Sequence, residues 1–242
     1  MRLIQHKKEA YWFYRFLSTG YDRWVNPLFW TPAMRSDALR GAQLDERTLE
    51  VLDAGAGTGF TTEGIVERVD ADCVTMLDQS PHQLRHAERK PALERCTKVL
   101  GDAEALPFPY GDFDLVGCLR VLHHVARPEL VVSEIARVTR PGGRLLIADQ
   151  LGDVDPMRSL ELDRFERARD PSHTRLLPDA DIRGYLDAND LIVTANEIVR
   201  ERRDMETYLD LVGLEGEERE RIARMAPPVH EVEIGWYLAR KP

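Results

Sequence analysis

The sequence VLDAGAGTGF at residues 51–60 decides the fold class of this chain. An apolar run leads into three glycines at alternate positions, Gly55, Gly57 and Gly59. Glycines at a turn from a strand to a helix let the backbone bend tightly and let a ligand approach where a Cβ would collide. The dinucleotide pattern GxGxxG needs a glycine where this sequence has Phe60. With Asp53 just before it, the loop favours a ligand with a positively charged or hydrogen-donating group over NAD.

Short apolar runs recur on both sides of this loop. Seven of them predict strands, at residues 49–52, 73–77, 97–100, 113–119, 144–148, 191–199 and 232–239. Helical patterns lie between the first five, as at residues 61–69, 81–90 and 128–139, and the sequence RPGG at 140–143 predicts a sharp turn after the last of these. The alternation predicts an α/β fold with a doubly wound, mostly parallel sheet and helices on both faces.

Two regions interrupt the alternation. In residues 152–190 we expect a helical insertion in place of a direct crossover, and in the charge-dense residues 201–225 a solvated helical face. The N-terminal region holds nine aromatic residues within twenty positions: Tyr11, Trp12, Phe13, Tyr14, Phe16, Tyr21, Trp24, Phe29 and Trp30. Apolar residues there recur at three- and four-residue steps, which predicts an amphipathic helix before Pro27.

Composition excludes several classes of protein. The chain of 242 residues is 43% hydrophobic and carries a net charge of -9, which favours a soluble globular protein and disfavours a nucleic acid as its main partner. Its three cysteines show no metal-ligand spacing. With no signal-peptide pattern and no long apolar stretch, we expect a cytoplasmic protein that needs no metal and does not insert stably into a membrane.

Carboxylates follow the first three predicted strands. Asp78 lies about 20 residues past the glycine loop, where an acid can accept hydrogen bonds from ribose hydroxyls, and Asp102 is placed to accept from an adenine amino group. Together with Asp53, these acids lie at the edge where open α/β sheets bind ligands.

These motifs resemble those of the class I S-adenosylmethionine-dependent methyltransferases over roughly residues 45–200. The resemblance implies seven strands in the order 3-2-1-4-5-7-6, with the last strand antiparallel, and S-adenosylmethionine as cofactor. It implies that the glycine loop lies by the methionine part of the cofactor and that the backbone near Leu119 meets the amino group. Together these arguments give the expected cofactor contacts: Asp53, Gly55, Ala56, Gly57, Asp78, Gln79, Asp102, Ala103, Glu104 and Leu119.

A narrower resemblance concerns the N-terminal half. Residues 12–22 (WFYRFLSTGYD), 77–84 (LDQSPHQL) and 101–109 (GDAEALPFP) look like the 2-methyl-6-phytyl-1,4-benzoquinol methyltransferases, which methylate a ring carbon of a prenylated quinol. After about residue 115 the chain looks more like generic small-molecule methyltransferases. The resemblance implies C-methylation of a quinol or phenolic ring.

Methylation of a quinol carbon requires a base, because the carbon becomes nucleophilic as its neighbouring hydroxyl loses a proton. The candidates are His123 and His124, which follow the fourth strand, and His173 in the helical insertion. His123 and His173 are also candidate substrate contacts, as is Arg120, which can orient an oxyanion.

Other readings remain open. O- or N-methylation of another small metabolite uses the same cofactor motifs, and so does a non-catalytic cofactor-binding protein. A metal-dependent O-methyltransferase would need clustered carboxylates, for which Asp149, Asp153 and Asp155 are close in sequence. The sequence leaves the oligomeric state open.

The aromatic region receives a role from the same resemblance, since an N-terminal helix commonly closes over the cofactor in such enzymes. We expect residues 1–44 to form a helical lid and residues 45–242 the Rossmann-like cofactor-binding domain. Tyr14 and Tyr21 are seven residues apart and so lie on the same face of a helix. They are the expected lid contacts, with Tyr21 favoured.

Overall fold

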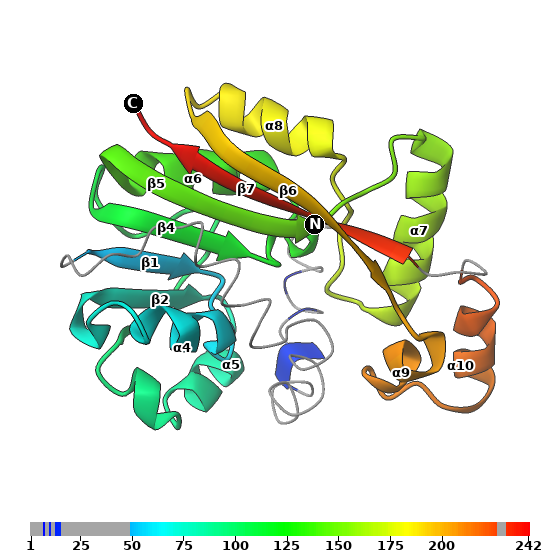
Figure 1. Cartoon of the computed structure of the whole chain (residues 1–242). Coiled ribbons are helices and arrows are strands. Elements are labelled where there is room, and N and C mark those ends of the chain that lie inside the picture. Colours follow the sequence, from blue (N-terminus) through cyan, green and yellow to red (C-terminus); the bar gives the residue numbers. More distant parts are fainter. Residues whose placement is uncertain (1–6, 8–9, 11–12, 16–48, 227–230) are drawn as a thin grey trace.

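The computed structural model describes residues 7, 10, 13–15, 49–226 and 231–242. Strands and helices alternate along them (Figure 1). The strands are β1 (Val51–Ala54), β2 (Val74–Asp78), β3 (Thr97–Leu100), β4 (Phe113–Leu119), β5 (Thr139–Gln150), β6 (Ile192–Arg202) and β7 (Glu231–Arg240). The α-helices are α4 (Phe60–Val66), α5 (Pro81–Ala87), α6 (Pro128–Val138), α7 (Pro156–Arg169), α8 (Asp179–Asp187), α9 (Met205–Asp210) and α10 (Gly216–Ala223).

The seven strands form one sheet in the order β3-β2-β1-β4-β5-β7-β6. The pairs from β3 to β5 are parallel, and β7 is antiparallel to both β5 and β6. The predicted fold class is therefore confirmed in its strand number, order and direction. Of the expected N-terminal lid, residues 7, 10 and 13–15 are helical, while the rest of the lid lies outside the described residues.

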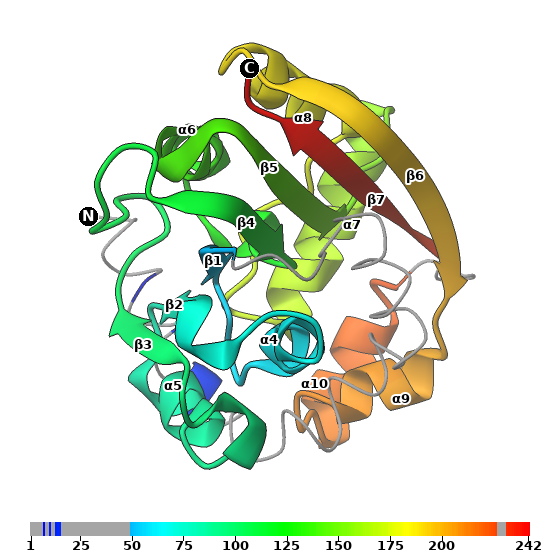
Figure 2. The same cartoon turned by 60° about the vertical axis from the view of Figure 1, so that its left-hand side comes forward.

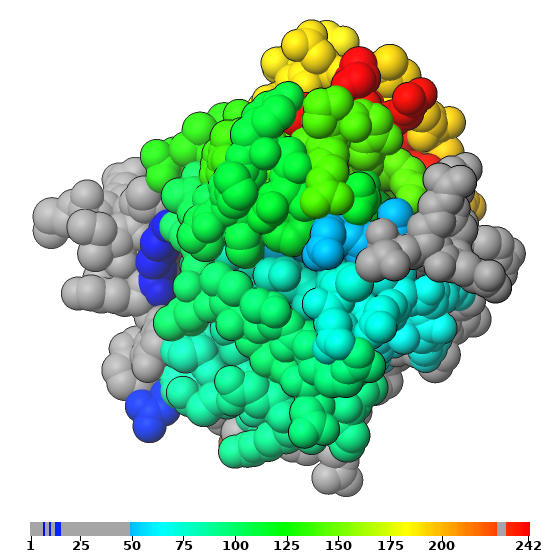
Figure 3. Space-filling model, turned by 90° about the vertical axis from the view of Figure 1, so that its left-hand side faces the viewer, coloured from blue at the N-terminus to red at the C-terminus, as the bar shows by residue number. Residues whose placement is uncertain are grey.

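Helices cover both faces of the sheet, because alternate side chains of its strands point to opposite sides. In β5, Leu145 and Ile147 join the core under α6 and α8, whereas Leu146 and Ala148 join the core under α4 and α5. Figure 2 shows the sheet close to edge-on between these helices. The space-filling view in Figure 3 shows the β1–β5 half as one continuous cyan and green surface.

A third, smaller core lies beyond the sheet, where α7, α9 and α10 meet (Figure 1). Its buried members are Phe165, Tyr208, Leu209 and Ile222. The charged residues of α10 are mostly exposed, as expected for residues 201–225, but Arg203 is buried. The expectation of a purely solvated face therefore missed a buried polar group.

Residues 140–143 (RPGG) follow the end of α6 closely, as expected, but they lie within β5 and not in a turn before it. Helix α6 ends at Val138, and β5 begins at Thr139, opposite Phe113 of β4. The Gly142 N–H donates to Lys241 O at 2.9 Å, and the Lys241 N–H donates to Gly143 O at 3.0 Å. Because these backbone groups find partners in the chain after β7, the segment extends the strand.

Candidate active site

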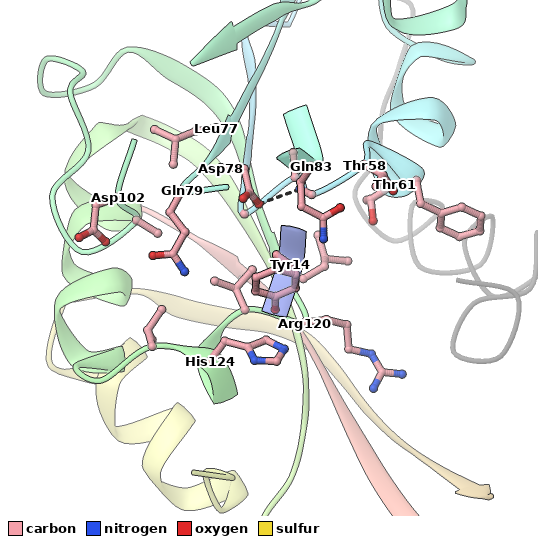
Figure 4. A pocket seen from close by; sticks show the side chains of 18 residues that line it. Tyr14, Thr58, Thr61, Leu77, Asp78, Gln79, Gln83, Asp102, Arg120 and His124 are labelled. Carbon is pink, nitrogen blue, oxygen red and sulfur yellow. Dashed lines mark hydrogen bonds between the residues drawn. The ribbon is translucent and has the colours of Figure 1, made fainter. Parts of the chain in front are cut away.

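A pocket lies at the carboxyl ends of β1, β2, β3 and β4, next to Tyr14 of the N-terminal region. Figure 4 shows Tyr14 between Asp78 and Gln83 on one side and His124 and Arg120 on the other. The expected site residues that line it are Tyr14, Gly55, Ala56, Gly57, Asp78, Gln79, Asp102, Ala103, Leu119, Arg120 and His124. The other described lining residues are Thr58, Phe60, Thr61, Leu77, Gln83, Val121 and Val125.

The glycine loop forms the floor of this pocket, and its shape requires glycine. Gly55 has a φ of 84°, and a Cβ there would lie 2.3 Å from Val121 Cγ2. The N–H groups of Gly55 and Ala56 both donate to Leu77 O, at 2.7 and 3.0 Å. A larger residue at position 55 would therefore clash with Val121 and displace the loop.

Asp78 at the end of β2 holds the loop from the other side. Its Oδ2 accepts from the Gly57 N–H at 2.9 Å, and its Oδ1 accepts from the Ser80 N–H at 2.7 Å. Burial raises the pKa of Asp78 to about 6, although both hydrogen bonds act to lower it. An ionised carboxylate has about four lone-pair sites, so Asp78 can accept further hydrogen bonds from a ligand.

Asp53 lies beneath the loop, outside the lining of the pocket. Its side chain is buried, and its Oδ2 accepts from Thr62 Oγ1 at 2.6 Å. Burial, with a contribution from the charge of Asp78, raises the pKa of Asp53 to about 6. Asp53 thus contributes to the electrostatic field of the site and holds the start of α4 through Thr62, but it does not line the pocket.

The acids after β3 differ in their positions. Asp102 lines the pocket, its Oδ1 accepts from the Glu104 N–H at 3.0 Å, and its carboxylate contacts the Lys7 ammonium group. Glu104 is buried outside the lining, where it accepts from the Arg127 N–H at 2.9 Å and from Arg127 Nη2 at 3.0 Å. In this structure Glu104 therefore fixes the start of α6 and contacts Lys7, at 3.4 Å.

Arg120 leaves β4 in a left-handed backbone conformation, with a φ of 61°. Its N–H donates to Ala148 O at 2.7 Å, and its Nη2 lies 3.8 Å from a Glu201 carboxylate oxygen. Glu201 lies at the same distance from Arg203 Nη2. Burial, followed by the charge of Arg203, lowers the pKa of Arg120. Arg120 thus connects the pocket to a group of two arginines, Arg120 and Arg203, with Glu201 between them.

The three candidate histidines lie near one another, each with a polar partner. The His123 and His124 ring centroids are 3.9 Å apart, and those of His123 and His173 are 5.8 Å apart. His123 Nδ1 contacts Asp149, and His173 Nε2 lies 2.9 Å from Asp163 Oδ1. His123 and His173 are absent from the lining of the pocket as the described residues form it.

His124 faces the pocket, where its ring meets the edge of the Tyr14 ring at a centroid distance of 5.9 Å. Burial and the neighbouring charge of His123 lower the pKa of His124 to about 3. The imidazole is therefore neutral near pH 7 and has one nitrogen that can accept a hydrogen bond. Tyr21, the favoured lid residue, lies outside the described residues.

Sequence reasoning missed Gln83, which lies on α5 and lines the pocket. Its side chain is 2% exposed, and its Oε1 is buried with no hydrogen-bond partner among the described residues. A buried acceptor of this kind marks a place for a ligand donor. The sequence signal that was available is its position in the first turn of the helix that follows Asp78.

In the part of the chain that the structure describes, no group of three or more His, Cys, Asp or Glu side chains is arranged to hold a metal ion. None of the helices described is long and apolar enough to cross a bilayer.

Comparison with known proteins finds similarity to methyltransferases. Residues 52–147 match the family described as Methyltransferase domain. The chain is 52% identical over 155 residues to 2-methyl-6-phytyl-1,4-hydroquinone methyltransferase 2, chloroplastic, of Oryza sativa subsp. japonica. This match covers 64% of the chain and 44% of the rice protein, so the chain spans less than half the length of that relative.

A more distant relative is covered more fully. The Ubiquinone/menaquinone biosynthesis C-methyltransferase UbiE of Roseobacter denitrificans is 27% identical over 195 residues, which are 78% of this chain and 74% of that protein. Among solved structures, a putative methyltransferase from Bacillus halodurans superposes with a TM-score of 0.79 at 24% identity, covering 87% of this chain and 99% of the other. The sequence matches confirm the resemblance to methyltransferases, including those named for a phytyl hydroquinone, and the superposition confirms the fold.

Proposed function

We propose, on the premise that residues 52–147 carry a methyltransferase domain, that this protein transfers a methyl group from S-adenosylmethionine to a ring carbon of a quinol or phenol. The observation that carries the cofactor assignment is the hydrogen bond from the Gly57 N–H to Asp78 Oδ2. This bond joins the glycine loop to Asp78. Asp78 lines the pocket and can still accept hydrogen bonds from a ligand there.

The residues present fit the cofactor. Asp78 suits the two ribose hydroxyls and Asp102 the adenine amino group, because carboxylates accept hydrogen bonds and these groups donate them. At Gly55 a Cβ would collide with Val121, so the loop beneath the pocket needs glycine there, and Gln83 offers a buried acceptor. When bound, the cofactor supplies a methyl group on a positively charged sulfur, which is already a strong electrophile.

The remaining task of the chain is to orient the acceptor and to manage its proton. With a phenol pKa near 10 and an ordinary histidine pKa near 6.5, complete proton transfer before methylation is uphill by about 5 kcal/mol, and the lowered pKa of His124 makes complete transfer to that ring costlier still. The hydroxyl proton must therefore shift as the new bond forms. We assign hydrogen bonding of the acceptor hydroxyl to His124, and stabilisation of its developing negative charge to Arg120. His123, paired with Asp149, and His173 are the further candidates for taking up the proton.

The choice of a quinol rests on the relatives. The rice protein is named for a phytyl hydroquinone, and the Roseobacter protein for C-methylation in ubiquinone and menaquinone biosynthesis. Neutral His124 beside a cationic arginine also suits an acceptor with a hydroxyl that ionises during the reaction.

We further propose the domain division given above, with residues 1–44 as a lid over residues 45–242 and a helical insertion around residues 152–190. Tyr14 and Lys7 support the lid, since one lines the pocket and the other contacts Asp102. Helices α7 and α8 lie within the insertion.

A cytoplasmic location of the protein stays a prediction.

The cofactor assignment is tested by thermal shift. S-adenosylhomocysteine should raise the melting temperature of the protein, because a ligand that binds only the folded state stabilises it. No shift with this compound, together with a clear shift from NAD, would contradict the assignment.

The acceptor is tested by incubating the protein with methyl-labelled S-adenosylmethionine and a panel of prenylated quinols, simple phenols and amines. We expect label on the quinols. Label that appears only on amines would replace the proposal with N-methylation.

A further inference from the structure

Ser172 connects His124 to Asp170. Its Oγ lies 2.9 Å from His124 Nδ1 and 2.5 Å from Asp170 Oδ1. The Ser172 N–H also donates to Asp170 Oδ1, at 2.8 Å. Ser172 and Asp170 are both buried, with exposed fractions of 0% and 7%. The contact thus joins the turn after β4 to the loop between α7 and α8, away from bulk water.

The two segments are held together by the backbone as well. The Thr174 N–H donates to His123 O at 2.8 Å, and Thr174 Oγ1 lies 2.7 Å from Val125 O. These bonds flank the Ser172–His124 contact on both sides. Its geometry is therefore set by the fold and does not depend on side-chain contacts alone.

The available protons decide which way each hydrogen bond runs. Ser172 has one hydroxyl proton, and a carboxylate can only accept, so that proton points to Asp170. Ser172 Oγ can then meet His124 Nδ1 only as an acceptor, which places the imidazole proton on Nδ1. In a neutral ring, Nε2 then carries a lone pair.

We propose that Ser172 and Asp170 are positioning residues that hold His124 as the Nδ1–H tautomer, so that Nε2 accepts a hydrogen bond from a hydroxyl of the methyl acceptor. This inference rests on the proposed function for the identity of the acceptor. It narrows the substrate class to acceptors that present a hydroxyl hydrogen beside the reacting carbon. The lowered pKa of His124 agrees with a neutral ring.

The tautomer is measured directly by NMR of the full chain labelled with ¹⁵N-histidine, using the two-bond couplings from ring protons to each ring nitrogen. We expect the His124 signals of the native protein to show a protonated Nδ1 and an unprotonated Nε2. A protonated Nε2, or an even mixture of tautomers, would overturn the proposal.

A variant gives a second, kinetic readout. Ser172→Ala removes the acceptor for Nδ1–H, so we expect a mixed His124 tautomer and a fall in kcat with a prenylated quinol of about 100-fold. The affinity for S-adenosylhomocysteine should stay within about twofold, because Ser172 does not line the pocket. Ser133→Ala, at an exposed position of α6, is the matched control and should leave both quantities unchanged.

The outcomes separate this inference from the proposed function. A Ser172→Ala variant that binds the cofactor product and keeps the native kcat would refute the positioning role. If the native protein methylates no quinol, the proposed function fails. The tautomer measured in the native protein still decides whether Ser172 and Asp170 hold His124 with its proton on Nδ1.

Discussion

The Gly57 N–H donates to Asp78 Oδ2 at 2.9 Å, so the loop after β1 and the acid at the end of β2 form one unit. The second carboxylate oxygen of Asp78 accepts from the Ser80 N–H at the start of α5. Because both donors are backbone groups, the fold itself orients the carboxylate before any ligand arrives. Such preorganisation reduces the entropy that binding must overcome.

Asp78→Asn should weaken the binding of S-adenosylhomocysteine by about 10- to 100-fold, which corresponds to the loss of a hydrogen bond to a charged group. The substitution replaces one acceptor oxygen with an NH2 group, which would then face the N–H donor of Gly57 or of Ser80. Isothermal titration calorimetry measures the change. Asp187→Asn, at an exposed position of α8, is the control, and equal affinities for the two variants would contradict the assigned role.

The affinity for S-adenosylhomocysteine should also depend on pH. Burial raises the pKa of Asp78 to about 6, so the carboxylate that accepts from ribose hydroxyls is ionised above this pH and protonated below it. The dissociation constant should therefore increase as the pH falls from 7 to 5, approaching about tenfold per unit. Calorimetry across this range on the native protein should show the slope, and the Asp78→Asn variant should show a flatter profile.

Burial of a second carboxyl group, that of Asp53, makes the free energy of unfolding fall as the pH rises. The pKa of Asp53 is raised to about 6 in the folded protein, above its ordinary value of 3.8, so the folded state binds the proton more tightly than the unfolded state. The stabilisation is complete below pH 3.8 and is lost as the pH rises through 6. Urea unfolding of Asp53→Asn from pH 4 to 7 should show a smaller decline in the free energy of unfolding than the native protein. An unchanged decline would assign the pH dependence to other groups.

Gly55→Ala should destabilise the fold more than Gly142→Ala does. Both glycines have positive φ, but a Cβ at Gly55 would lie 2.3 Å from Val121 Cγ2, whereas nothing lies within 4 Å of one at Gly142. We expect the difference to be about 1–3 kcal/mol in the free energy of unfolding, the usual effect of overpacking. Adding Val121→Ala should recover part of the loss at Gly55, and strict additivity of the two changes would argue against the clash.

The small core beyond the sheet predicts a cost for Tyr208→Phe. The Tyr208 hydroxyl donates to Glu166, at 2.9 Å from its Oε2, and accepts from Arg203 Nη1 at 3.1 Å. Because all three side chains are buried, losing the hydroxyl should lower the free energy of unfolding by about 1–3 kcal/mol. Tyr185→Phe, whose hydroxyl meets the exposed Arg175, should change it by less than about 0.5 kcal/mol in urea unfolding.

The cofactor half of the site could be predicted from the sequence because it depends on local geometry. A strand that ends in Gly55 and Gly57, and a second strand that ends in Asp78, must meet at one edge of a parallel sheet. The strand order likewise followed from a resemblance carried by these motifs. Asp53 and Glu104 show the limit, since being next to a motif did not bring either side chain into the pocket wall.

The acceptor half depends on contacts between distant parts of the chain. Adjacent histidines cannot be told apart by pattern, and only the fold shows that His124 faces the pocket while His123 meets Asp149. His124 Nδ1 meets Ser172, which lies 48 residues away in another segment. Contacts of this kind leave no periodic signal in the sequence.

The central claim is methyl transfer to a ring carbon of a quinol, and the attachment atom tests it most directly. The protein would be incubated with S-adenosylmethionine that carries a ¹³C-methyl group and with a prenylated quinol, and the product would be examined by NMR. We predict a new methyl signal coupled to an aromatic ring carbon. A labelled methyl bound to oxygen, or no labelled product while the protein still binds S-adenosylhomocysteine, would contradict the claim.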